Sequence, residues 1–133
     1  MMFRFPIIAI ALFLAACAAR PIQNVDSHPI PPSAQALSLT EIENEIAEAA
    51  SARGWWVDKK ATGHLIATLS KPQAYEAIVD LKFSQKSYSI VYNTSHGLID
   101  AQGNIHYNYG RWVHFLDQDI QQRLSLAARR KNP

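Results

Sequence analysis

The chain has 133 residues, of which 48% are hydrophobic and 18% are charged, and its formal net charge is +2 at pH 7. A length and a hydrophobic share of this order suit one domain with one apolar core, and they are too small for two full domains. Because the net charge is small and no dense stripe of Lys and Arg runs along the chain, the composition argues against a nucleic-acid-binding protein.

The first segment of the chain has the layout of an export signal. Arg4 supplies a short positive region, an apolar run begins at Pro6, and small residues precede Cys17, which is the only cysteine. A run of about ten apolar residues is too short to cross a bilayer core, which needs about 20. Residues 14–17, Leu-Ala-Ala-Cys, resemble the lipobox of bacterial lipoproteins.

The lipobox resemblance implies both a location and an anchor. It implies that residues 1–16 form a signal peptide that is removed, and that Cys17 then carries a diacylglyceryl thioether and an acylated amine. Ala18 stands where the inner-membrane retention signal of many two-membrane bacteria has Asp. The implied destination is therefore the outer membrane, with the domain facing the periplasm. With Cys17 acylated, no thiol is left for a disulfide.

Residues 17–36 have the composition of a linker. Polar and small residues dominate the segment, and it shows no hydrophobic period. Its prolines are Pro21, Pro29, Pro31 and Pro32. We interpret the segment as a tether that lets the folded part stand away from the membrane. A single globular domain is then expected over residues 37–128, followed by a basic tail at 129–133.

The first helix is expected directly after the tether. Ser38 and Glu41 have the spacing of a capping box, and Leu37 and Ile42 occupy the positions of a hydrophobic staple. Apolar residues then recur with the helical period up to Gly54, which is placed to end the helix. Glutamates fill the opposite face, where we expect them to be solvated.

After this helix the hydrophobic period changes to two, which is typical of strands. Runs at 55–57 and 64–69 predict a hairpin, and further strands are predicted at 75–83 and 88–92. Because the connections are short, an antiparallel meander of these strands is favoured. The positions expected to face the helices are Leu65, Ala67, Leu69, Tyr75, Ala77, Val79, Leu81, Phe83, Tyr88, Ile90 and Tyr92.

A second helix is predicted from Asn108, its expected N-cap, to about Ala128, with the basic tail as a frayed end. The arc expected to pack on the sheet is Trp112, Val113, Leu116, Ile120, Leu124 and Ala127. The order of elements is then αββββα. It predicts a two-layer α+β domain, in which both helices pack on one face of a four-stranded antiparallel meander sheet.

A further resemblance rests on residues 88–92 and 103–113. The second stretch contains the pattern Ile-His-x-x-Tyr-x-Arg-Trp over residues 105–112. Together with the lipobox, it is similar to a family of small, functionally uncharacterised bacterial envelope lipoproteins. The likeness covers most of the chain after the signal, although Gly110 stands where the family's pattern has Asn. The resemblance implies an envelope location and a fold, and it implies no reaction.

One cluster of side chains, His96, Asp100, His106 and His114, is a candidate for metal or acid–base chemistry. Its spacing matches no ligand motif, and the chain shows no nucleophile paired with a base and no glycine-rich phosphate loop. We therefore expect no catalytic residue, no metal and no cofactor, and a structural hydrogen bond for His106 near the helix start. A small hydrolase or metal-binding protein that uses His96, Asp100 and His106 is the alternative.

The first candidate docking surface is the start of the second helix. Tyr107, Tyr109 and Arg111 combine aromatic area with a cation there, and His106 precedes them. These residue types are enriched where proteins dock, and Trp112 beside them is expected in the core. A purely structural role, in which they tie the preceding loop to the helix, is the competing interpretation.

The second candidate surface is the sheet face turned away from the helices. Ile66, Ile78 and Val91 are expected there, together with either Trp55 or Trp56. Scattered exposed aliphatic residues are normal, whereas a continuous patch needs a cover, either a partner chain or a second copy of this chain. A third candidate surface is formed by Phe115 and Leu126 on the flank of the second helix. The simpler interpretation is that these two side chains cover the sheet edge.

These observations lead to one functional expectation. The chain is expected to be a non-catalytic binding or accessory module, held to the outer membrane by lipid on Cys17. Its expected partner is an envelope protein complex or peptidoglycan, and not nucleic acid. A homo-oligomer formed through the open sheet face is a further candidate.

Overall fold

The computed structural model describes residues 19–133, so the expected signal peptide and Cys17 lie outside the described residues. The elements in chain order are β1 (Ala19–Arg20), β2 (Val25–Pro29), the 3-10 turn η1 (Pro32–Ala34), α1 (Leu39–Ala52), β3 (Trp56–Ala61), β4 (His64–Lys71), β5 (Tyr75–Phe83), β6 (Ser87–His96), β7 (Ile105–His106) and α2 (Tyr107–Lys131). Within this described part of the chain, no helix is both long and apolar enough to cross a membrane.

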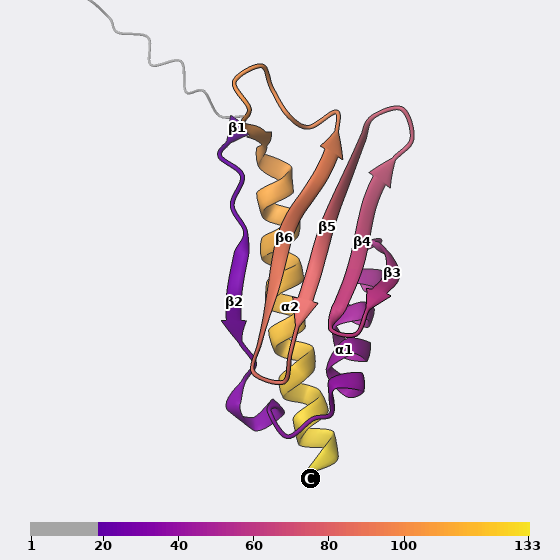
Figure 1. The fold of residues 1–133 in the computed structure, drawn as a ribbon, viewed down its shortest axis with the longest axis vertical. Coiled ribbons are helices and arrows are strands. Elements are labelled where there is room, and N and C mark those ends of the chain that lie inside the picture. Colours follow the sequence, from indigo (N-terminus) through magenta and orange to yellow (C-terminus); the bar gives the residue numbers. More distant parts are fainter. Residues whose placement is uncertain (1–18) are drawn as a thin grey trace, which may run out of the picture.

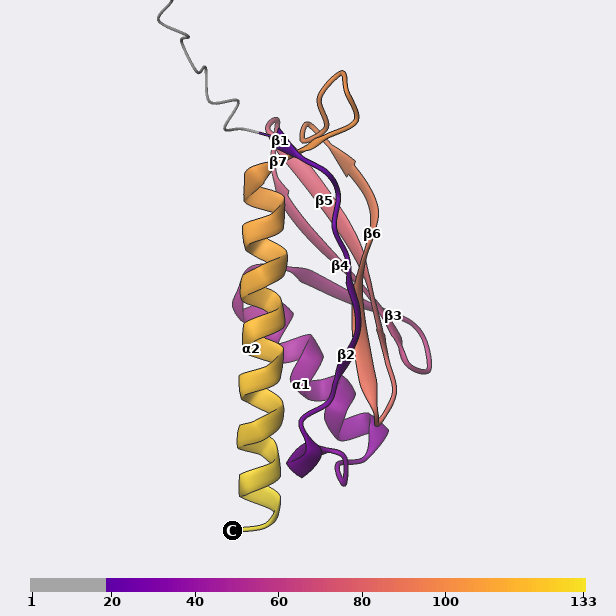
Figure 2. The ribbon, with the colours of Figure 1, turned by 90° about the vertical axis from the view of Figure 1, so that its left-hand side faces the viewer.

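The main sheet has five antiparallel strands in the order β2-β6-β5-β4-β3, and a small ladder pairs β1 with β7. Both helices pack on one face of this sheet, and no element of the described chain covers the other face (Figures 1 and 2). The predicted α+β class is confirmed. The meander from β3 to β6 is present, but the sheet has a fifth strand, β2, beyond β6.

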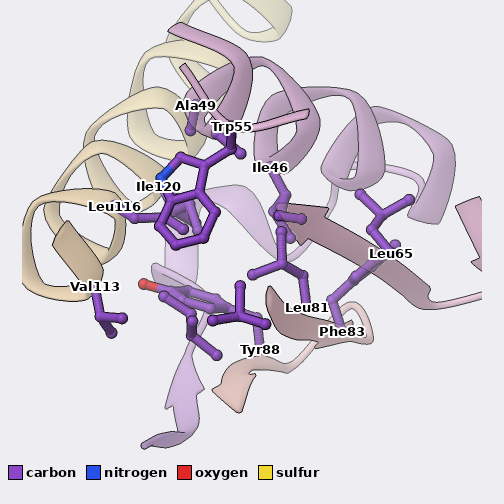
Figure 3. Packing of buried hydrophobic residues seen from close by; sticks show 14 of the residues in the cluster. Ile46, Ala49, Trp55, Leu65, Leu81, Phe83, Tyr88, Val113, Leu116 and Ile120 are labelled. Carbon is purple, nitrogen blue, oxygen red and sulfur yellow. The ribbon is translucent and has the colours of Figure 1, made fainter. Parts of the chain in front are cut away.

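The core lies between the helices and the covered face of the sheet (Figure 3). Alternation along β5 puts Ala77, Val79 and Leu81 into this core and leaves Glu76 and Lys82 exposed, as the period of two predicts. Three apolar residues of α2 that recur with the helical period, Leu116, Ile120 and Leu124, are fully buried against the same core. The alternating residues of β5 and the residues of α2 that recur with the helical period are therefore buried in the same core.

The start of α1 follows its local sequence closely. The Ser38 Oγ accepts a hydrogen bond from the Glu41 backbone N–H, and the Glu41 carboxylate accepts one from the Ser38 N–H, so the predicted capping box is confirmed. Leu37 and Ile42, the two residues of the predicted staple, are both buried. The helix ends at Ala52, shortly before Gly54.

The expected tether at 17–36 differs from what the structure shows over its described part. Val25 pairs with Ile90 and His28 with Tyr88, so β2 is an edge strand of the main sheet. Ile30 and Ala34 are completely buried in the core. The prediction took the prolines as the sign of a tether. Proline is also tolerated in an edge strand, although not in a central strand. The folded domain therefore begins near residue 19 and not at residue 37.

The expected basic tail is also corrected, and the glutamates of the expected acidic face form ion pairs at the surface. The helix α2 continues to Lys131, so most of the segment 129–133 is helical. Cations of α2 pair with the glutamates of α1 because the two helices lie side by side. The pairs are Lys131–Glu41 at 2.7 Å, Arg130–Glu45 at 3.2 Å and Arg123–Glu48 at 2.8 Å. The hydrogen bond from Lys131 lowers the pKa of Glu41.

Candidate functional site

The open face of the sheet gathers the residues of the second predicted surface. Strand register places Trp56, Thr68, Ile78 and Thr94 in one row across four strands. The next row is Asp58, Ile66, Asp80 and Val91. The predicted set of Ile66, Ile78 and Val91 therefore lies on one face, and each of these side chains is half-buried. We call these two rows the open face.

The two consecutive tryptophans have opposite environments. Trp55 is buried in the core, whereas Trp56 is 71% exposed at the β3 edge of the open face. The Trp56 indole N–H donates a hydrogen bond to the Asp58 carboxylate at 3.1 Å, which orients the ring along the strand. Because residues alternate between faces along a strand, only one of the two can point into the core. Trp56 is thus the exposed aromatic residue of this face.

Polar side chains on the same face are held by one another. The His64 Nε2 lies 2.5 Å from Asp80 Oδ1, and the Asn93 side-chain amide donates to Asp80 Oδ2 at 3.0 Å. His64 and Asp80 are both half-buried. A carboxylate held by two donors is fixed in orientation, so Asp80 and its partners form an ordered polar cluster on the central strand, between Ile66 and Val91.

The predicted corner at the start of α2 is divided between core and surface. Tyr109 is only 1% exposed, and its ring packs edge-on against Tyr92 with centroids 5.7 Å apart. Trp112 is half-buried against Tyr75, with centroids 4.9 Å apart. The prediction that Tyr109 contributes to a docking surface is therefore wrong, because the helix is rotated so that this ring points at the sheet. Burial raises the pKa of the Tyr109 hydroxyl.

The other members of this corner remain at the surface. Tyr107 is 39% exposed and stacks on His106, with ring centroids 4.6 Å apart. His106 Nδ1 accepts a hydrogen bond from the Asn108 backbone N–H at 3.1 Å, so His106 is the N-cap and Asn108 is not. The structural hydrogen bond predicted for His106 is confirmed. Arg111 is exposed, and its guanidinium lies 6.0 Å from the ring centroid of Phe115.

The candidate ligands His96, Asp100 and His106 are either exposed or engaged in local hydrogen bonds. One Asp100 carboxylate oxygen accepts hydrogen bonds from the backbone N–H groups of Gln102 and Asn104. His96 is exposed, and His106 caps α2. Among residues 19–133, no group of three or more His, Cys, Asp and Glu side chains is arranged to hold a metal ion. The structure thus does not bring His96, Asp100 and His106 together as a ligand set.

The third predicted surface is partly covered. The Arg53 guanidinium lies 5.0 Å from the Phe115 ring centroid and pairs with Asp119 at 2.6 Å. Leu126 is 42% exposed on the flank of α2. The Phe115 ring is therefore in contact with arginine side chains. Leu126 is a single exposed aliphatic residue, and such residues are common on protein surfaces without a partner.

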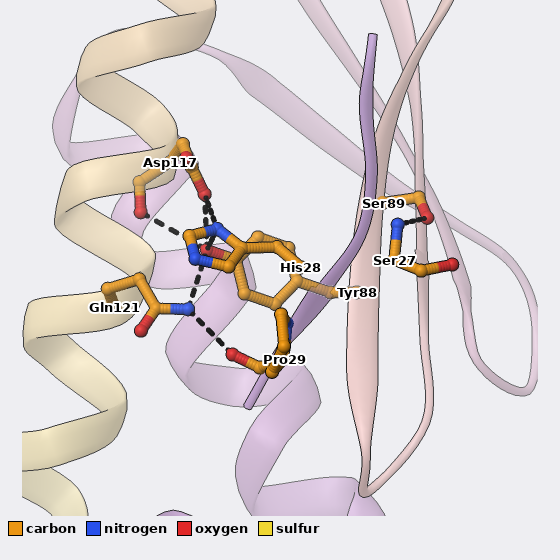
Figure 4. A network of polar contacts seen from close by, with 7 residues as sticks. All are labelled: Ser27, His28, Pro29, Tyr88, Ser89, Asp117 and Gln121. Atoms are coloured by element: carbon orange, nitrogen blue, oxygen red, sulfur yellow. Dashed lines mark hydrogen bonds and ion pairs between the residues drawn. The ribbon is translucent and has the colours of Figure 1, made fainter. Parts of the chain in front are cut away.

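A polar network between β2 and α2 was missed by the sequence analysis (Figure 4). His28 Nδ1 lies 2.7 Å from Asp117 Oδ1, and the Tyr88 hydroxyl donates to the same oxygen. The Gln121 amide donates to the Tyr88 oxygen at 3.1 Å and to the Pro29 carbonyl at 2.9 Å. Burial, reinforced by the bond to Asp117, raises the pKa of Tyr88.

This network holds the edge strand β2 against the helix. A β-bulge at Ser27, whose φ of 46° is in the left-handed region, re-aims His28 toward α2. The Ser27 N–H donates to Ser89 Oγ on the neighbouring strand at 2.8 Å, which secures the bulge. Because the bulge breaks the alternation of β2, the usual period-two signal of a strand is absent from this segment.

Comparison of the chain with protein-family models, with curated proteins and with solved structures finds no match. Of the surfaces described, the open face is the one that combines a highly exposed aromatic residue, aliphatic neighbours and an ordered polar cluster.

Proposed function

We propose that this chain is a lipid-anchored, non-catalytic accessory module of the bacterial outer membrane, and that it docks a protein of an envelope complex through its open face. The observation that carries the proposal is the exposure of the Trp56 side chain. An indole with 71% of its surface exposed, on a sheet face that no described element covers, leaves a large apolar area in water. Buried tryptophans are frequent energetic centres of protein interfaces.

The surroundings of Trp56 fit this interpretation. Protein interfaces combine an apolar centre with a polar rim. Here Ile66, Ile78 and Val91 add apolar area on three neighbouring strands, and the Asp80 cluster with His64 and Asn93 lies among them, between Ile66 and Val91. Because these polar groups are already paired within the chain, a partner can cover the aliphatic area without leaving them unpaired.

The anchor in this proposal is the lipid on Cys17. It rests on the lipobox resemblance of residues 14–17, and Ala18 after the cysteine supports the outer membrane as the destination. With the lipid in that membrane, the described domain faces the periplasm. The competing candidate, a small hydrolase or metal-binding protein that uses His96, Asp100 and His106, has no comparable observation in its favour.

The proposal is tested by purifying the full-length acylated protein from gently solubilised envelopes and identifying co-purifying proteins by mass spectrometry. We expect a reproducible partner that is lost with Trp56→Ala and with Ile78→Asp, because both changes remove apolar contact area from the open face. Leu126→Asp is the matched control, since Leu126 is an exposed aliphatic residue on α2 and away from that face. Far-UV circular dichroism verifies that each variant is folded.

The other candidate covers of the open face give different results. A second copy of this chain predicts a dimer in analytical ultracentrifugation that Ile78→Asp dissociates. Peptidoglycan predicts co-sedimentation with purified sacculi that Trp56→Ala abolishes. A partner that all three variants retain would contradict the open face as the docking site.

A further inference from the structure

The described fold begins very close to the proposed anchor. In β1, Ala19 pairs with His106 and Arg20 with Ile105, so the second residue after Cys17 is already part of a ladder. In the sequence, one residue, Ala18, separates Cys17 from this strand. A lipid on Cys17 therefore holds this end of the domain at the membrane surface, without the spacing that a free tether at 17–36 would provide.

We infer that this end of the domain rests on the phospholipid head groups of the membrane that the Cys17 lipid enters. We call it the anchor end, and it consists of β1, β7, the loop 97–104 and Tyr107. Figures 1 and 2 show β1, β7 and the loop before β7 together at one end of the long axis, with the C-terminus at the other. The inference rests on the proposed acylation of Cys17 and adds the orientation of the domain to it.

Exposed apolar side chains at the anchor end suit a bilayer surface. Ile99 in the loop is 45% exposed, and Tyr107 is 39% exposed. These are two of the four large hydrophobic residues that are exposed within residues 19–133, the others being Trp56 and Leu126. Tyrosine is enriched at membrane interfaces because its ring is apolar and its hydroxyl is polar. An exposed aliphatic side chain such as Ile99 can enter the outer part of the acyl region.

The charges at this end favour contact with anionic head groups. Arg20 is an exposed cation of the anchor end itself, and two further exposed cations lie in segments next to it, Lys71 at the β4–β5 turn and Arg111 in the first turns of α2. The nearby carboxylates are Glu76 and Asp100, and Asp100 is engaged with backbone N–H groups of its own loop. Basic residues beside a membrane anchor are attracted by the negative surface potential of anionic lipids.

The anchor end is also hollowed. A cleft of about 190 Å³ lies between residues 20–23 and the start of α2, and its lining includes Arg20, His106 and Tyr107. Arginine and tyrosine side chains carry hydrogen-bond donors that can bind a phosphate. A lipid head group can therefore enter between these two segments while the acyl chains of Cys17 occupy the bilayer beside it.

This orientation decides which surfaces reach the periplasm. The helix α2 runs from the anchor end to the far end of the domain (Figure 2), and its 25 residues span about 37 Å at 1.5 Å per residue. The helix thus stands upright on the membrane. Arg129 to Lys131 lie at its far end, away from the lipid, and the open face is presented sideways to other proteins of the same membrane.

The test uses the full-length acylated protein on vesicles of phosphatidylethanolamine and phosphatidylglycerol. An environment-sensitive fluorophore is attached to Gln102→Cys in the loop of the anchor end or, as the matched control, to Asn132→Cys at the far end. A share of the lipid carries a spin label on its head group. We expect several-fold stronger quenching at position 102 than at position 132.

A second pair of variants tests the side chains. Arg20→Glu combined with Tyr107→Ser is expected to lower the quenching at position 102, while the protein still sediments with the vesicles through its lipid. Trp56→Ala, which lies outside the anchor end, should leave the quenching unchanged. An acylated protein that sediments but shows equal quenching at both positions would overturn the orientation and leave the anchor intact. A full-length protein whose mass shows no lipid on Cys17 would overturn both.

Discussion

Tyr88 and Tyr109 are both buried on the helix side of the sheet, but their hydroxyls are in opposite situations. The Tyr88 hydroxyl donates to Asp117 and accepts from Gln121, so its polar group is fully used. The Tyr109 hydroxyl finds no hydrogen-bond partner among residues 19–133. A buried polar group without a partner keeps its desolvation cost, whereas a paired group recovers most of it.

Removing each hydroxyl should therefore have opposite consequences. Tyr88→Phe should lower the free energy of unfolding by about 1–3 kcal/mol, because Asp117 and Gln121 lose a buried partner. Tyr109→Phe should leave the stability unchanged or raise it, because the packing of the ring against Tyr92 is kept. Urea unfolding at neutral pH measures both. A clear destabilisation by Tyr109→Phe would show that its hydroxyl has a partner, such as a bound water, that stabilises the fold.

At the scale of elements, the loop between β6 and β7 contains two glycines with similar backbone conformations and different surroundings. Gly97 has a φ of 73° and Gly103 a φ of 79°. A Cβ atom on Gly97 would overlap the backbone oxygen of Ala74 in the β4–β5 turn, whereas a Cβ on Gly103 would meet nothing within 4 Å. Gly97 thus permits the close approach of two chain segments at the anchor end.

The two glycines form a matched pair for mutation. Gly103→Ala should cost about 1–2 kcal/mol, the usual strain of an L-residue in the left-handed region. Gly97→Ala carries the same strain, and it must also displace the β4–β5 turn, so it should cost clearly more. Thermal unfolding of the two variants measures the difference. Equal melting temperatures would contradict the close approach of the Gly97 loop to Ala74.

At the scale of the whole molecule, the segment 19–36 is an integral part of the domain. Its strand β2 completes one edge of the sheet, and Ile30 and Ala34 are buried in the core. His28 and the Pro29 carbonyl bind side chains of α2. The segment therefore pairs with the edge of β6 that β5 leaves free, and it links this edge of the sheet to α2.

Truncation distinguishes a structural segment from a tether. A chain that begins at residue 19 should fold, because it contains every described element. A chain that begins at residue 37 should be unfolded or aggregated, because it loses the side chains of Ile30 and Ala34 from the core and exposes the edge of β6. Circular dichroism melting curves of the two chains measure this. Equal melting temperatures would support the tether.

Features encoded in short stretches of sequence were predictable. The capping box of Ser38 and Glu41, the hairpin before β5 and the alternation of β5 follow from neighbouring residues, because helix caps and strand periods are local properties. The open face was predictable for the same reason, since alternation assigns Ile66 and Ile78 to one side. The choice between Trp55 and Trp56 required the register of β3 against β4.

The tertiary structure alone decided the remaining features. Pairing of β2 with β6 joins residues more than 50 positions apart, and a bulge and prolines conceal it locally. Burial of Tyr109 depends on how α2 is rotated against the sheet, and the ion pairs of α1 with α2 depend on how the two helices cross. Such long-range contacts carry no local signature, because their free energy comes from packing between distant segments. The sequence by itself determined α1, the meander strands and the sides to which their alternating residues belong, because these are local properties. Packing decided that β2 joins the sheet, that Tyr109 is buried and that the described domain begins beside its proposed anchor.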